Sequence, residues 1–294
     1  MLATASGLRV RFAWFNVGVD WLYAAPRRFM WLDMIHGTIE RRVLLNYRFD
    51  PSTLQRALPR PFRPKLYHGH GVGGICMIRF SGLRPRFTPR WLGLRSENAA
   101  HRIAAEWEQD GEQREGVFIP RRDTNSQFNR LLGGRAFPGI FQKSLFKAHE
   151  VASSVSVRIL REDGGEEVAF IGHLAQALPP ASIFPSLAEA VGFFSLGATG
   201  YSATHTEGHY HGMELRCLDW SVVPLAVDEA RSCFFDDRQR FPAGTAQLDC
   251  ALLMRGTAHE WRSRPDLYLS AQGDSLTTRP SAGGASGRDV KGNA

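Results

Sequence analysis

Lysine is scarce in this sequence. Only four of its 36 basic residues are lysines, namely Lys65, Lys143, Lys147 and Lys291, and this excess of arginine is typical of a GC-rich, bacterial genome. A covalent mechanism that needs an amine is therefore restricted to very few side chains. Arginine cannot take over that role, because its guanidinium stays protonated at biological pH.

Cysteine is also sparse, and its spacing is uninformative. The four cysteines, Cys76, Cys217, Cys233 and Cys250, lie far apart in the sequence and form no CxxC pair. This pattern excludes a disulfide framework and a closed zinc knuckle. It favours a protein of the reducing cytoplasm.

Long hydrophobic runs are absent as well. The first thirty residues are rich in Trp, Phe and Leu, but charged residues such as Arg9, Asp20 and Arg27 interrupt every stretch that could span a membrane. We therefore expect no membrane span, and we interpret residues 1–35 as an N-terminal amphipathic extension or a misplaced start. The sequence also has no GxSxG elbow, which excludes the simplest hydrolase mechanism.

The charge does not indicate a nucleic-acid partner. A net charge of +7 over 294 residues is too dilute for that inference. Between residues 79 and 95 arginines alternate with aromatic residues, as in some single-strand binders, but Pro85 and Pro89 favour an ordinary exposed loop. We expect no nucleic-acid binding, and no motif indicates an oligomeric state.

Hydrophobic alternation predicts a chain made mainly of strands. Val43, Leu45, Tyr47 and Phe49 would share one face of a strand, with Leu44 on the other face. Capping residues predict helices over residues 50–58, 123–134 and 185–197, the last with a capping box of Ser and Glu. Further strands are expected at residues 74–80, 99–107, 139–150, 151–163, 168–174, 214–227 and 246–254.

These elements indicate an α+β fold that is mainly antiparallel β. Many strands, few helices and sequential hairpins are typical of a barrel or a strongly bent sheet. With 43% hydrophobic residues, residues 36–269 can form a single domain. From Ser270 to Ala294 the sequence is rich in Gly, Ser and Ala, which predicts a disordered tail.

Several ordered stretches resemble the YqjF-like domain-of-unknown-function family, which is grouped with acetoacetate decarboxylase by fold. The resemblance covers about residues 36–230. It is carried by RRVLLNYRFDPSTLQRALPRPF, LYHGHGVGGICMIRFSGLRPRFTP, SENAAHRIAAEW, REGVFIPRRDTNSQFNRLLGG and GYSATHTEGHYHGMELRCLDWSVVPL. It implies a decarboxylase-like barrel with a cavity, and no established activity.

The resemblance also implies candidate ligand-binding residues. Glu97 and Arg102 match the family's acidic residue and arginine, although His101 stands where that pattern is usually aliphatic. Arg121 and Arg122 follow FIP, where acetoacetate decarboxylase has GFPKK with a lysine that forms a Schiff base. These arginines could bind a carboxylate. Alternatively, they are solvated turn residues or pair with Asp123.

We therefore expect a protein that binds a small, anionic organic molecule without Schiff-base chemistry and without a cofactor. Whether it is an enzyme is left open. One alternative is a lyase or hydrolase acting on a keto acid, with Lys143 or Lys147 as a relocated amine. Another alternative is a protein-interaction domain whose hydrophobic N-terminal segment docks on a partner.

Two further motifs have ordinary explanations. GHGVGG has the GxGxxG spacing of a dinucleotide site, but a strand follows it, so a glycine-rich hairpin turn is expected instead. HTEGHYHG offers His205, His209 and His211 as metal ligands, in a spacing that matches no closed site. We interpret this segment as a solvated polar loop and expect no bound metal.

Overall fold

The computed structural model describes residues 34–85, 88–127 and 139–278. Most of the expected N-terminal extension and the end of the expected tail lie outside these ranges. No helix in the described ranges has the length and apolarity needed to cross a membrane.

Strands dominate the described ranges, in which only two short α-helices occur, α1 (Pro51–Ala57) and α3 (Leu187–Leu196), with a single turn of 3-10 helix, η3 (Arg90–Leu92). The strands are β1 (Met34–Phe49), β2 (Arg63–Pro64), β3 (Leu66–Tyr67), β4 (His70–Pro85), β5 (Leu94–Gln109), β6 (Glu112–Thr124), β7 (Phe141–Glu150), β8 (Ser154–Arg161), β9 (Glu166–Leu174), β10 (Thr199–Ala203), β11 (His209–Cys217), β12 (Val223–Ser232), β13 (Ala246–Leu269) and β14 (Leu276–Thr277).

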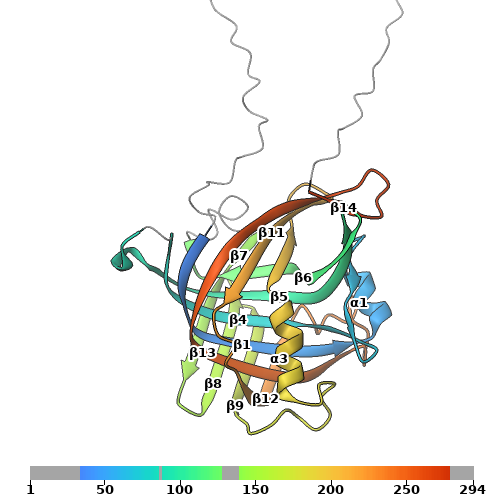
Figure 1. Cartoon of the computed structure of the whole chain (residues 1–294). Helices are drawn as coiled ribbons and strands as arrows, with labels where there is room; N and C mark the ends of the chain where they lie inside the picture. The colour runs from blue at the N-terminus through green and yellow to red at the C-terminus, as the bar shows by residue number, and fades with distance from the viewer. Residues whose placement is uncertain (1–33, 86–87, 128–138, 279–294) are drawn as a thin grey trace, which may run out of the picture.

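These strands form one strongly bent sheet, as the sequence predicts (Figure 1). Most neighbours are antiparallel, but β6 pairs in parallel with β7 and β10, and β14 pairs in parallel with β5. The long strand β13 pairs with β1 along most of its length, and it pairs with β12 and with β11 at two different points, so the sheet folds back on itself. The expected mainly antiparallel fold with few helices is confirmed.

The central strand β1 is buried on both faces. Val43 and Leu45 pack in one apolar core with residues of β8 and β9, whereas Leu44 packs in a second core. Helix α3 lies over the second core and contributes Ala190 and Phe194 to it. Figure 1 shows α3 in front of the sheet, crossing β1 and β4. The second core contains the cavity described below.

Local capping explains where the two helices begin. Asp50 caps α1 by accepting a hydrogen bond from the Thr53 N–H, and Pro51 occupies the first turn. Ser186 caps α3 by accepting from the Glu189 N–H at 3.2 Å. The Glu189 carboxylate accepts a hydrogen bond from the Tyr67 hydroxyl and not from the Ser186 N–H, so the capping box is incomplete. Both N-terminal caps were predicted correctly.

The turn before β4 consists of His68 and Gly69, so only the first residue of GHGVGG lies in it; residues 70–74 begin strand β4, and no helix follows. His68 and Gly69 have φ values of 46° and 80°, which are the left-handed values that a two-residue turn between β3 and β4 requires. Gly74 allows a close approach of strands, because a Cβ at this position would lie 2.1 Å from the Leu45 carbonyl oxygen. A strand follows the turn, as expected, but the expected glycine-rich turn is limited to Gly69, and the other glycines of the motif lie in β4.

Two local predictions need correction. The helix expected from Asp123 does not begin there, because Asp123 and Thr124 are the last residues of β6; its remainder falls largely on residues 128–138, outside the described residues. The disordered tail expected from Ser270 is also wrong at its start. Leu276 is fully buried, and β14 pairs with β13 and β5. This single apolar side chain extends the core beyond residue 269.

Candidate functional site: a cavity lined by three arginines

Three arginines from three strands lie on the same face of the sheet. They are Arg42 of β1, Arg102 of β5 and Arg122 of β6, and their exposed fractions are 9%, 7% and 8%. Strand register explains their convergence. Arg42 pairs with Ile78, Arg122 pairs with Ala100, and Arg102 lies two residues beyond Ala100 on the same strand face. The strand register therefore places three guanidinium groups together in the second core.

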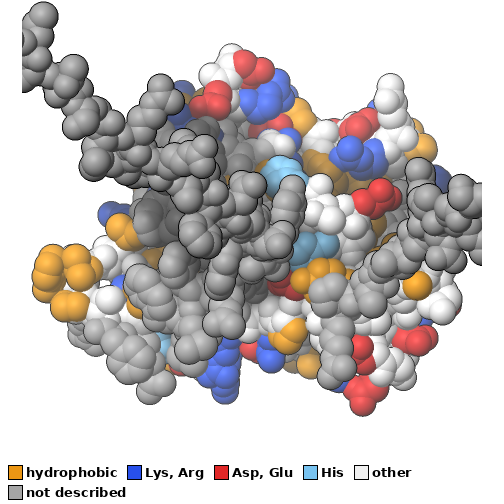
Figure 2. Space-filling view, turned by 90° about the horizontal axis from the view of Figure 1, so that it is seen from above, with side chains coloured by type: hydrophobic (Ala, Val, Ile, Leu, Met, Phe, Trp, Pro, Cys, Tyr) orange, Lys and Arg blue, Asp and Glu red, His pale blue; other side chains and the backbone are white. Residues whose placement is uncertain are grey.

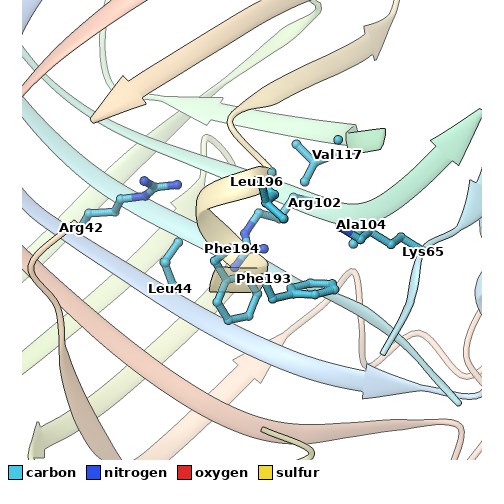
Figure 3. Close-up of a pocket in the computed structure, with 11 residues that line it drawn as sticks. Arg42, Leu44, Lys65, Arg102, Ala104, Val117, Phe193, Phe194 and Leu196 are labelled. Atoms are coloured by element: carbon cyan, nitrogen blue, oxygen red, sulfur yellow. The ribbon is translucent and has the colours of Figure 1, made fainter. Parts of the chain in front are cut away.

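These arginines line a cavity of about 90 Å³. Most of the other lining residues are apolar, including Ile78, Phe80, Ile119, Phe141, Met213 and Trp261. A smaller cavity of about 20 Å³ shares Arg42 and Arg102 with it and extends toward Lys65 under α3 (Figure 3). Phe194 of α3 lies over Arg102, with the guanidinium carbon 4.9 Å from the ring centre. The arrangement combines positive charge with an apolar wall.

The hydrogen bonds of these three arginines go to neutral groups. Arg42 donates to the sulfur atoms of Cys76 and Cys217 at 3.2 and 3.5 Å. Arg102 donates to Asn46, and its Nε is buried without a hydrogen-bond partner. Arg122 donates to Ser202 Oγ at 3.1 Å. Among the described residues, no carboxylate lies within ion-pair distance of any of the three.

Burial lowers the pKa of two of these three guanidinium groups. The pKa of Arg102 is lowered to about 10, chiefly by burial and further by the nearby charge of Arg42. The pKa of Arg122 is also lowered to about 10 by burial. Both guanidiniums remain charged at neutral pH. The cavity is therefore positively charged without a counter-ion from the described chain.

Glu97 does not line this cavity. Its carboxylate lies on the other face of β5, where it accepts hydrogen bonds from Arg41 and Arg79 at 2.5 and 2.6 Å. The same two arginines also bind Glu150 at 2.9 and 3.0 Å. Arg255 also lies 3.8 Å from Glu150, so three arginines share the two carboxylates. Each of these arginines has an acidic partner, so the network offers no unpaired cation to a ligand.

Arg121 also lies away from the cavity. It binds both oxygens of Asp123 at 2.9 and 3.1 Å and contacts Glu167 at 3.0 Å. The structure therefore separates the two neighbouring arginines, with Arg121 in an ion pair and Arg122 in the cavity. Of the four residues suggested by the resemblance, Arg102 and Arg122 converge and Glu97 and Arg121 do not.

The lysines proposed as relocated amines are on a different strand. Lys143 of β7 forms an ion pair with Glu162 at 2.9 Å, and Lys147 is exposed. Neither residue lines either of the two arginine-lined cavities. Lys65 lines the smaller cavity, but its amine is held by Glu115 at 2.8 Å.

The structure brings together two of the three candidate metal ligands in the segment HTEGHYHG. His209 and His211 lie with Asp266 of β13, and one ligating atom from each residue lies within 4.8 Å of the others. His205 is not part of this group. Asp266 could not be selected from the sequence, because more than fifty residues separate it from the histidines and only the pairing of β11 with β13 brings them together.

Arg42 was missed as a candidate residue. Its signal in the sequence is its position on the strand face that also carries Leu44 and Asn46. An arginine among residues that alternate into a core is the kind of side chain that a binding cavity requires. The candidate residues implied by the resemblance included neither Arg41 nor Arg42.

Comparison with solved structures shows the fold. Acetoacetate decarboxylase from Legionella pneumophila subsp. pneumophila str. Philadelphia 1 is similar with a TM-score of 0.51 at 9% identity, over 88% of this chain and 99% of that chain. An acetoacetate decarboxylase-like enzyme from Sphingomonas wittichii RW1 has a TM-score of 0.48 at 12% identity, over 78% and 90%. The enduracididine biosynthesis enzyme MppR, complexed with pyruvate, has a TM-score of 0.49 at 10% identity, over 81% and 90%.

The bent sheet thus belongs to a recognised class of fold. The chain has the acetoacetate decarboxylase-like fold, as the first of these similarities shows. No family model matches the chain, and no curated protein gives a significant match. At these identities the similarity concerns the fold alone, so the function must be argued from the cavity.

Proposed function

We propose that this protein, a YqjF-like member of the acetoacetate decarboxylase-like superfamily, binds a small organic carboxylate in the arginine-lined cavity. The observation that carries the proposal is the absence, among the described residues, of any carboxylate paired with Arg42, Arg102 or Arg122. A bound anion would supply the missing negative charge.

The energetic argument concerns the cost of burying charge. Moving one ion out of water costs several kcal/mol even after the protein relaxes, and a partner of opposite charge offsets that cost. Three such ions in one cavity reduce the stability of the free protein. A ligand that pairs with them recovers this free energy on binding, which explains why such an arrangement can be retained.

The cavity also suggests the shape of the ligand. Guanidinium groups bind a carboxylate through paired, parallel hydrogen bonds. The apolar residues around them, including Ile78, Phe80 and Met213, can contact a short hydrocarbon body. We therefore infer a ligand with a carboxylate at one end and a small apolar portion at the other, such as a short-chain organic acid or keto acid.

Schiff-base chemistry is not part of this proposal. It requires a neutral amine that attacks a ketone, and a guanidinium cannot provide one. Lys143 is paired with Glu162, Lys147 is exposed, and Lys65 is paired with Glu115. These positions favour binding through charge over a lyase mechanism with a relocated amine.

Calorimetric titration tests the proposal. We expect straight-chain carboxylates from acetate to hexanoate, or acetoacetate, to bind the wild-type protein, and the matching uncharged amides to bind far more weakly. Arg102→Met should weaken carboxylate binding by about 2–5 kcal/mol, because it removes one charged partner from a buried pair. The matched control is Arg95→Ala, since Arg95 is exposed and paired with Glu40.

Two results would contradict the proposal. One is carboxylate affinity in Arg102→Met equal to that of the wild type. The other is equal affinity of the wild type for hexanoate and hexanamide, because a cavity that selects by charge must distinguish them.

A further inference from the structure

We propose that His209, His211 and Asp266 form a binding site for a divalent transition-metal ion. The Nε2 atoms of His209 and His211 lie 3.1 and 3.8 Å from the same carboxylate oxygen of Asp266, Oδ2. One ligating atom from each residue lies within 4.8 Å of the others. This proposal is independent of the carboxylate-binding function proposed above.

Strand geometry explains why these three side chains meet. His209 and His211 are two residues apart on β11, so their side chains leave the same face of the strand. On the neighbouring strand, Tyr268 pairs with His209, and Asp266 lies two residues before Tyr268 on the same face. The pairing of Tyr210 with Leu267 continues to His211 beside Asp266, so Asp266 lies next to His211 and diagonally across from His209.

The separations suit metal coordination. Zinc binds imidazole nitrogen and carboxylate oxygen at about 2.1 Å, so neighbouring ligands in a tetrahedral site are about 3.4 Å apart. The distances from Asp266 Oδ2 to the two histidine nitrogens, 3.1 and 3.8 Å, lie on either side of this value. A small shift of the side chains would therefore bring them to the spacing of metal ligands. Two imidazoles and one carboxylate are ligands that Zn²⁺, Fe²⁺ and related ions accept, and they leave at least one coordination position open.

Neighbouring groups already orient the ligands. The His209 ring stacks on Tyr268, with centres 4.5 Å apart and planes 9° from parallel, and it meets the His211 ring nearly edge-on at 5.0 Å. The three side chains are 21%, 13% and 22% exposed, which restrains them and still allows an ion to enter from solvent. Figure 2 shows histidine side chains among apolar and charged groups on the face seen from above.

The metal site would lie beside the arginine-lined cavity. His211 pairs with Ser202 of β10, and residues opposite one another in a pair share a face of the sheet. Ser202 accepts the hydrogen bond from Arg122, and the next pair on that face, Gly200 with Met213, lines the cavity. An ion held by His211 would therefore be close to the place where we propose that a carboxylate binds.

The competing explanation is a hydrogen-bonded cluster without metal. A carboxylate can accept hydrogen bonds from two imidazoles, and the separation of 3.1 Å between His209 and Asp266 is within hydrogen-bond range. A metal site and such a cluster differ in one decisive property. Only the metal site takes up an ion stoichiometrically, with release of protons from its ligands.

Equilibrium dialysis of the full chain, freed of tag and treated with chelator, tests the proposal. With ZnCl₂ in the low micromolar range, we expect one zinc ion per chain by elemental mass spectrometry. Asp266→Asn and His209→Ala should each weaken zinc binding at least about 100-fold, since the first replaces an anionic oxygen ligand with a neutral amide and the second removes an imidazole ligand. In the wild type, Co²⁺ should give the visible absorption bands of a protein-bound ion, and both variants should lose them.

Matched controls are available in the same chain. His205→Ala changes a nearby histidine outside the cluster, and His173→Ala changes an exposed histidine that also contacts a carboxylate, Asp228. Both controls should retain the zinc ion. Circular dichroism shows whether each variant is folded, and Asp266→Asn keeps the size of the side chain. Absence of stoichiometric zinc and cobalt from the wild type, or equal zinc uptake by folded Asp266→Asn, would overturn the proposal.

Discussion

Adjacent arginines of identical chemistry have opposite environments in this protein. Arg41 and Arg42 are consecutive in β1, so their side chains leave opposite faces of the strand. Arg41 is fully buried and pairs with Glu97 and Glu150, whereas Arg42 contacts two cysteine sulfurs. Arg121 and Arg122 differ in the same way, since Arg121 pairs with Asp123 and Arg122 donates to the Ser202 hydroxyl. Charge pairing is thus decided by the strand face of each residue.

Two buried histidines make the fold sensitive to acid. The pKa of His101 is lowered to about 4, chiefly by burial, and the pKa of His259 is lowered to about 3 by burial and the nearby Arg42. Both are neutral in the folded protein at pH 5, whereas an unfolded chain takes up protons below pH 6.5. The stability that they contribute is therefore present above pH 6.5 and is lost as pH falls toward 4.

We predict that the free energy of unfolding decreases by up to about 1.4 kcal/mol per pH unit for each of these histidines between pH 6 and 4. Urea unfolding at each pH measures it. The pH dependence should be smaller in His259→Phe than in the wild type, because phenylalanine has no group that takes up a proton. If the free energy of unfolding depended on pH equally in the wild type and in His259→Phe, His259 would not be a cause of the acid sensitivity.

At the scale of elements, glycine has different effects on stability in helix α3 and in strand β4. Gly192 lies within α3, and a Cβ added there would have no neighbouring atom within 4 Å. Gly74 lies in β4, where a Cβ would overlap the Leu45 carbonyl of β1. Glycine therefore weakens the helix at one position and permits the close pairing of two strands at the other.

We expect opposite effects of the same substitution at these two glycines. Gly192→Ala should raise the free energy of unfolding by about 0.5–1 kcal/mol, because alanine favours the helix and fits without contact. Gly74→Ala should lower it by about 1–3 kcal/mol or more, because strands β1 and β4 must separate. Thermal and urea unfolding measure both. Destabilisation by Gly192→Ala would contradict the open environment described for α3.

The elements themselves were predictable, but their arrangement was only partly so. The alternation of Val43, Leu45 and Tyr47 and the cap at Ser186 depend on neighbouring residues, which the sequence displays directly. The parallel pairing of β6 with β10 joins segments far apart in the chain, and the parallel pairing of β6 with β7 requires a crossover instead of a hairpin. No local pattern specifies such pairings, so the bent sheet was foreseen as a class and its strand order was not.

The same reason limits prediction of the candidate site. The resemblance marked four residues near two strand ends, and a one-residue change of position moves a side chain to the opposite face. Arg102 and Arg122 therefore line the cavity while Glu97 and Arg121 are in ion pairs on the other face. Arg42 and Asp266 depend on the pairing of distant strands, which the sequence alone does not show.

At the scale of the whole molecule, the bent sheet separates charges into two populations. One face carries arginines balanced by carboxylates, and the other face, covered by α3, carries three arginines paired with none among the described residues. The balanced arginines stabilise the fold. We propose that the unpaired arginines bind a ligand. Removing one arginine from each face should therefore have different effects on the stability of the free protein and on its stabilisation by the ligand.

The most direct measurement is the melting temperature of Arg122→Met and Arg41→Met, each without and with a saturating carboxylate that binds the wild type. Arg41→Met should lose about 1–3 kcal/mol of stability, because Glu97 and the partly exposed Glu150 each lose one partner while Arg79 still pairs with both. Free Arg122→Met should remain within about 1 kcal/mol of the wild type or exceed it, since no carboxylate loses its partner. Ligand at a hundredfold excess over its dissociation constant should stabilise the wild type by about 2.7 kcal/mol and Arg122→Met by far less. Destabilisation of free Arg122→Met as large as that of Arg41→Met, with ligand stabilisation unchanged, would contradict the account.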